Sequence, residues 1–122
     1  MGRYTDIAKT LNSYFNKFCP SYAKGVIPKD KQKPYLTYTV SDTAEFEDNI
    51  IQVMVYGKGK SLLEVSEIVD KIEIDLKNGI TISAIGSSFS TIYLRKGSPF
   101  AQHLNDDSTG MAVYINIIQK IL

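Results

Sequence analysis

The spacing of apolar residues predicts an amphipathic helix at the start of the chain. Apolar side chains recur every three or four residues from Tyr4 to Phe18, and polar residues fill the positions between them. Pro20 marks the end of this helix, because the residue before a proline avoids the helical conformation. A stripe this rich in aromatic residues needs a broad surface to cover, most simply a β-sheet.

Alternation of apolar and polar residues predicts the strands of that sheet. The alternation over residues 35–40 is typical of a half-buried strand. The first two predicted strands are joined by a short connection and most simply pair as an antiparallel hairpin. The predicted strands cover residues 35–40, 49–56, 80–85, 89–95 and 111–120, and loops are predicted over residues 21–33, 41–48, 57–60 and 96–110.

A second amphipathic helix is predicted to begin at Ser61. Ser61 and Glu64 have the spacing of a capping box, in which each side chain bonds the backbone of the other residue. Apolar residues then recur at helical spacing as far as Leu76. Gly79 marks the end of the helix, because glycine adopts the left-handed cap conformation easily.

The order of these elements predicts the fold class. A helix, two strands, a second helix and two or three further strands indicate an α+β two-layer sandwich. We expect a mainly antiparallel four- or five-stranded sheet with both helices packed on one face, because each helix has a single apolar stripe. Residues 1–122 suit one domain with one core.

Composition narrows the classes of function. Hydrophobic residues make up 43% of the chain and charged residues 22%, as in an ordinary globular protein. The formal net charge of +1 argues against a dedicated nucleic-acid binder. We expect no signal peptide, because Arg3 and Asp6 interrupt any apolar run, and no stretch reaches the ~18 apolar residues of a membrane span. The chain therefore has the pattern of a protein of cytoplasmic origin.

Isolated reactive residues do not form a catalytic or metal-binding pattern. His103 and Cys19 are the only residues of their types, whereas zinc requires three or four ligands. An exposed loop histidine and a packed cysteine are the simpler interpretations. The run from Gly57 to Ser61 has the end of a phosphate-binding loop, but the first glycine of that pattern is missing. We predict no catalytic residue, cofactor or metal, and no enzymatic activity.

Candidates for contact with other proteins fall into three groups, of which the last is the predicted loop 96–110. The first is the acidic segment 41–48, for which a solvated turn is the alternative interpretation. The second is the sheet face opposite the helices, which is too rich in tyrosine and methionine for open water; these residues are enriched at protein interfaces. The predicted contact residues are Asp42, Glu45, Phe46, Glu47, Asp48, Tyr35, Tyr56, His103, Asp106 and Asp107.

The order and spacing of the elements resemble a family of bacteriophage proteins. The resemblance lies in the segments Pro-Tyr-Leu-Thr-Tyr at 34–38 and Ile-Ile-Gln-Val-Met-Val-Tyr-Gly at 50–57, the helix from Ser61, and the closing strand at 110–117. This arrangement is similar to the tail terminator, or tail completion, proteins of long-tailed phages, the group around the lambda U protein. The resemblance covers nearly the full length, although its motifs are loose.

The resemblance implies a structural role in the virion. It implies a homo-oligomer, which we expect to be a hexameric ring. The ring would cap the tail tube at its head-proximal end, after assembly in the host cytoplasm. Such a ring stops polymerisation of the tail tube protein and offers a surface to a head-side neck or connector protein. DNA would pass through the lumen without sequence-specific binding, and no membrane is involved. The family has no catalytic residues to transfer to this chain.

Two other functions remain open at the level of sequence. One is another phage neck component, such as a head-closure or connector protein. The other is a regulatory module that binds a small ligand on a ferredoxin-like sheet.

Overall fold

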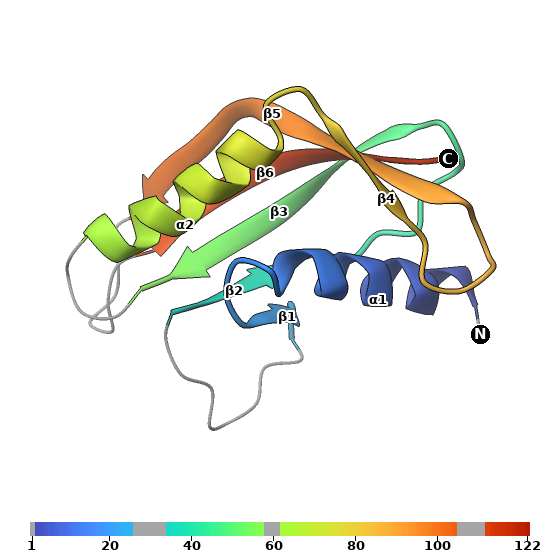
Figure 1. Cartoon of the computed structure of the whole chain (residues 1–122), viewed down its shortest axis with the longest axis horizontal. Coiled ribbons are helices and arrows are strands. Elements are labelled where there is room, and N and C mark those ends of the chain that lie inside the picture. The colour runs from blue at the N-terminus through green and yellow to red at the C-terminus, as the bar shows by residue number, and fades with distance from the viewer. Residues whose placement is uncertain (1, 26–33, 58–61, 105–111) are drawn as a thin grey trace.

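The computed structural model describes residues 2–25, 34–57, 62–104 and 112–122, without the side chains of Leu62, His103 and Leu104. Within these ranges the chain forms two helices and six strands (Figure 1). The elements follow the order α1 (Arg3–Phe15), β1 (Ser21–Ala23), β2 (Tyr35–Tyr38), β3 (Asp48–Tyr56), α2 (Leu62–Asp75), β4 (Ile80–Ser83), β5 (Thr91–Leu104) and β6 (Ala112–Ile121).

All six strands belong to one mixed sheet. Their order across the sheet is β1-β2-β3-β6-β5-β4. The pair β1-β2 is parallel, and every other neighbouring pair is antiparallel. The α+β class and the antiparallel hairpin of β2 and β3 are therefore confirmed. The predicted number of strands was wrong, because the sheet has six strands and a parallel edge.

Both helices pack on the same face of the curved sheet (Figure 1). Ile51, Val53 and Val55 of β3 point to that face and are completely buried. They belong to one core cluster that also includes residues of α1 and α2. Tyr14 of α1 donates a hydrogen bond to Asp75 at the end of α2, with 2.7 Å between the two oxygens. The prediction of two helices on one face is thus confirmed.

The short strand β1 corrects the predicted loop at 21–33. Its three residues carry no detectable alternation, and their position depends on contacts from α1. The side-chain oxygen of Asn16 accepts hydrogen bonds from the backbone and hydroxyl of Ser21, each at 3.0 Å. Asn12 donates to the carbonyl of Ser21, also at 3.0 Å. The rest of that predicted loop lies mostly outside the described residues.

Strand β5 corrects the second predicted loop, 96–110. The strand continues to Leu104 through an irregularity between Lys96 and Ala101, where its register with β6 shifts. An unpaired bulge of this kind accommodates Pro99, which has no backbone N–H to donate. The side chain of Asn116 in β6 donates a hydrogen bond to the carbonyl of Pro99 at 3.0 Å.

The end of α2 agrees with the sequence, whereas α1 ends earlier than the predicted end at Pro20. Helix α1 ends at Phe15, and Phe18 packs against the core beyond it. After α2, Gly79 has φ of +75° and its N–H bonds the carbonyl of Leu76 at 3.0 Å, which confirms the glycine cap. Ser61 and the predicted capping box lie outside the described residues.

Candidate interaction surface on the open face of the sheet

One face of the sheet is left uncovered by the two helices. Cross-strand partners share a face, so the register places alternate residues of β2, β3 and β6 together. We call this surface the open face. It consists of Tyr35, Thr37, Ile50, Gln52, Met54, Tyr56, Tyr114, Asn116 and Ile118.

Three tyrosines form a row across one end of the open face. The rings of Tyr35 and Tyr56 stack with centroids 4.8 Å apart. Tyr22 of β1 meets Tyr35 edge-on at 6.0 Å. Tyr35 is only 5% exposed, so its ring mainly supports Tyr56, which remains half-buried. Sequence analysis missed Tyr22, because the short strand that carries it has no recognisable pattern.

A groove lies beside this row of tyrosines. Its volume is about 240 Å³. That is smaller than the roughly 300–1,000 Å³ typical of pockets for small-molecule ligands. Side chains of the strands β2, β3 and β6 line it, together with one residue after β1 and one after β2. These are Lys24, Thr37, Thr39, Gln52, Val53, Met54, Tyr56 and Tyr114. The groove is therefore lined by both polar and apolar side chains, with a single cationic residue among them.

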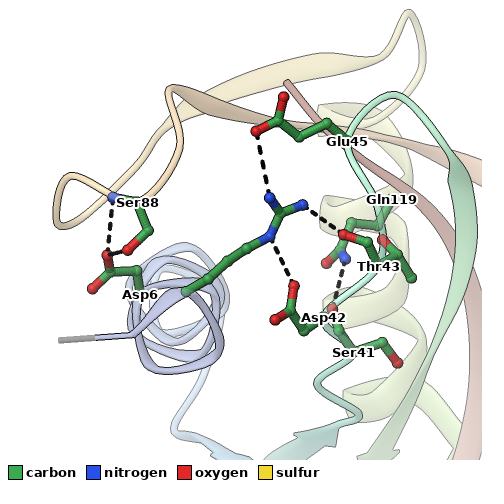
Figure 2. Close-up of polar contacts among 8 residues, drawn as sticks. Asp6, Ser41, Asp42, Thr43, Glu45, Ser88 and Gln119 are labelled. Atoms are coloured by element: carbon green, nitrogen blue, oxygen red, sulfur yellow. Dashed lines mark hydrogen bonds and ion pairs between the residues drawn. The ribbon is translucent and has the colours of Figure 1, made fainter.

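The acidic segment 41–48 is held against the N-terminus of α1 by Arg3 (Figure 2). The guanidinium donates to the carbonyl of Thr43 at 2.5 Å and to Glu45 at 3.4 Å. Its Nε lies 2.7 Å from Asp42, close enough for an ion pair although poorly aligned for a hydrogen bond. Both carboxylates are well exposed, so each pair contributes little to stability. The main effect of these contacts with Arg3 is to fix the position of the segment 41–48.

The other end of the acidic segment is also paired. Asp48 lies 3.1 Å from Arg95 and 3.5 Å from Lys120. Glu47 is exposed and forms no ion pair within the described ranges. Of the four carboxylates of this segment, three are thus engaged inside the chain. Glu47 is the one whose charge is open to a partner.

Phe46 is displayed at the tip of a turn in this segment. Its side chain is 67% exposed. Its φ of +66° lies in the left-handed region, which bulky side chains avoid. The N–H of Phe46 bonds the carbonyl of Ile121 at 2.9 Å, and the N–H of Glu47 approaches the carbonyl of Ala44 at 3.4 Å. These bonds hold the turn, and with it the ring, in place.

A second polar cluster ties α1 to the turn between β4 and β5. Ser88 donates hydrogen bonds to the buried carboxylate of Asp6 from its hydroxyl and from its N–H (Figure 2). The hydroxyl bond is the main cause that lowers the pKa of Asp6 below its ordinary value. Thr10 accepts a bond from the N–H of Ile85 at 2.9 Å. Each contact has a structural role.

The remaining predicted residues are placed as follows. His103 belongs to β5, opposite Val113, but its side chain lies outside the described residues. Asp106 and Asp107 also lie outside them. Their part in protein contact stays a prediction.

In the part of the chain described, Cys19 and the acidic residues do not form a catalytic or metal-binding site. The Cys19 thiol is buried, which raises its pKa to about 11 and keeps it protonated at neutral pH. No group of three or more His, Cys, Asp or Glu side chains comes together as metal ligands among the described residues. In those same ranges, neither helix is long and apolar enough to cross a membrane.

Comparison with known proteins identifies no relative. No protein-family model, curated protein or solved structure matches the chain.

Proposed function

We propose that the chain is a structural virion protein that forms a ring on the tail tube of a long-tailed phage. In this role it ends tail polymerisation and provides the surface to which the head joins. The observation that carries the proposal is the open face. It has a row of tyrosines and a groove, and the other side of the sheet is covered by the two helices.

The composition of the open face suits a protein partner. Tyrosine and methionine are enriched in interfaces because they offer large contact areas. Met54, Tyr56 and Tyr114 stand half-buried on this face and gather around one groove. Covering them with a neighbouring subunit would remove further apolar surface from water.

Ring formation needs two different surfaces on each subunit that meet when the subunits are rotated about one axis. The open face supplies one such surface. The acidic segment 41–48 supplies a second, because Arg3 and Asp48 hold it in a defined position at the opposite end of β3 (Figure 1). We propose a hexamer, with the tail tube protein and a head-side neck protein as further partners.

Charge is compatible with DNA passing through such a ring. The formal net charge is +1. Strong neutralisation of phosphates by lysine and arginine would hold DNA tightly. A nearly neutral subunit permits passage without sequence-specific binding.

The alternative of a ligand-binding module on a ferredoxin-like sheet has less support. That fold follows the order β-α-β-β-α-β. The described elements follow α-β-β-β-α-β-β-β instead. The groove of about 240 Å³ on the open face is small for a small-molecule ligand. The alternative of another phage neck component would rely on the same open face. An experiment is needed to distinguish it from a tail terminator.

The decisive experiment removes the protein from the assembling phage. Negative-stain images should then show tails of abnormal and variable length, and supplying the protein in trans should restore uniform tails. Tails of normal length that fail to join heads would instead indicate a neck component. Normal, infectious particles would contradict both structural roles.

A further inference from the structure

The turn that carries Phe46 has a backbone conformation that phenylalanine disfavours. A four-residue turn from Ala44 to Glu47 places Phe46 at its third position, where a positive φ favours glycine or asparagine. A residue with a side chain costs roughly 1–2 kcal/mol in the left-handed region. Burial of the ring does not offset this cost within one chain, because the ring is 67% exposed. Most of the ring is therefore available for contact with another molecule.

The groove on the open face has the size and lining to receive such a ring. An apolar cavity of roughly 150 Å³ accommodates benzene. The groove, at about 240 Å³, leaves room for a phenyl group between Met54, Tyr56 and Tyr114. Aromatic rings attract one another beyond simple burial, and a thioether adapts its shape to an inserted ring.

Charges beside the ring and beside the groove are complementary. Glu47 follows Phe46 directly and is exposed without an ion pair to any described residue. Lys24 lines the groove, is likewise exposed, and has no ion pair in the described ranges. Insertion of Phe46 thus brings an unpaired carboxylate toward an unpaired ammonium group.

The two features cannot meet within one chain. Phe46 precedes the first residue of β3, whereas the groove contacts Met54 and Tyr56 near its last residue. From Asp48 to Met54 the strand advances roughly 20 Å at its usual rise per residue. Figure 1 shows the corresponding ends of β3 on opposite sides of the molecule. The ring of Phe46 can enter only the groove of another copy.

We propose that Phe46 of one copy inserts into the groove of the next copy, with Glu47 beside Lys24. The contact joins two different surfaces, so it is head-to-tail and forms a ring when the rotation between successive copies closes. It rests on the proposed ring-forming function and names the contact that builds the ring. A buried aromatic anchor of this kind carries a large share of the energy of an interface.

The first test compares self-association of two variants by analytical ultracentrifugation. Phe46→Gly removes the ring and relieves the turn, so it should fold at least as stably as the wild type while associating about tenfold or more weakly. Ile74→Ser removes an equally exposed apolar side chain from α2, where 74% of Ile74 is accessible. It should associate as the wild type does.

The second test exchanges the charges. Lys24→Glu or Glu47→Lys alone places like charges together and should weaken association several-fold. The double variant restores an attractive pair and should recover most of the wild-type association. Asp70→Lys, on the exposed side of α2, makes a charge change of the same size outside the contact and should have little effect.

Several outcomes would overturn the inference. The first is a Phe46→Gly variant that associates as strongly as the wild type. The second is a double charge variant that associates no more strongly than the single variants. The third is a wild-type protein that stays monomeric at about millimolar concentration. None of these results decides the proposed function, which is judged separately by tail length in particles that lack the protein. Normal tail length with intact Phe46-dependent association would overturn the terminator role alone.

Discussion

Tyr35 and Tyr56 are cross-strand partners whose rings stack with centroids 4.8 Å apart and an interplanar angle of 23°. Their stack covers the junction of β2 and β3 on a face that no helix protects. It gives the open face a packed aromatic surface.

Removing Tyr56 should therefore destabilise the free subunit. Tyr56→Ser loses the stacked ring and exposes Tyr35, which should lower the free energy of unfolding by about 1–2 kcal/mol. Urea denaturation measures this as a shift in midpoint at constant slope. Tyr4→Ser provides the matched control, because Tyr4 is 55% exposed on α1. Equal effects of the two substitutions would show that the stack contributes nothing.

The sequence predicted both helices and the strands β2, β3, β4 and β6 at or near their observed positions. These elements share one property. Each has a run of residues long enough to show a period, as in Ile51, Val53 and Val55 of β3. Strand β1 has three residues, and its pairing depends on Asn12 and Asn16 from α1. Contacts between segments of this kind leave no periodic signal, so β1 could not be predicted.

Local residue preference misled the prediction of β5. Gly97 and Pro99 are typical of loops, yet the strand resumes after them because β6 is there to pair with Ala101 and the residues that follow. The same limit applies to the candidate site. Alternation identified Tyr35 and Tyr56, but the engagement of Asp42 and Asp48 depends on partners at distant positions in the chain.

The bond between Tyr14 and Asp75 connects the two helices. Burial, followed by the hydrogen bond to Asp75, raises the pKa of the Tyr14 hydroxyl above its ordinary value. Tyr14→Phe should lower the free energy of unfolding by about 1–2 kcal/mol near neutral pH. Urea denaturation of the two proteins measures the loss.

The pH dependence of that loss has a definite sign. A raised pKa in the folded state stabilises the protein below the unfolded value of about 10, and this stability is lost as pH rises further. Wild type should therefore lose stability above about pH 10 more steeply than Tyr14→Phe. Parallel curves for the two proteins would contradict the assignment.

Asp6 should make stability depend on pH at the acidic end. Its pKa is lowered in the folded state, mainly because the Ser88 hydroxyl bonds the carboxylate. The stabilisation is therefore present above the unfolded value of about 3.9 and disappears as pH falls below it. Asp6→Asn should have a lower thermal midpoint than wild type at pH 6, and the two midpoints should converge near pH 2. Asp70→Asn, an exposed control, should follow the wild type throughout.

Gly86 lies against the carboxylate of Asp6. Its substitution by alanine separates the cost of the backbone conformation from the cost of a clash with that carboxylate. Gly86 has φ of +105°, and a Cβ there would lie 2.3 Å from the carboxyl carbon of Asp6. Gly25 has φ of +90°, but open space surrounds the position of its Cβ. Gly25→Ala should therefore cost only the backbone term, about 1 kcal/mol, whereas Gly86→Ala should cost about 2–3 kcal/mol.

A double-mutant cycle with Asp6→Ala tests the origin of this difference. Removing the carboxylate first should reduce the cost of Gly86→Ala to the value seen at Gly25, because the clash is then absent and the backbone term alone remains. Urea denaturation of the four proteins in the cycle supplies the energies. A cost at Gly86 that stays the same without the carboxylate would mean that φ alone demands glycine. The contact between Asp6 and the turn would then have no part in selecting it.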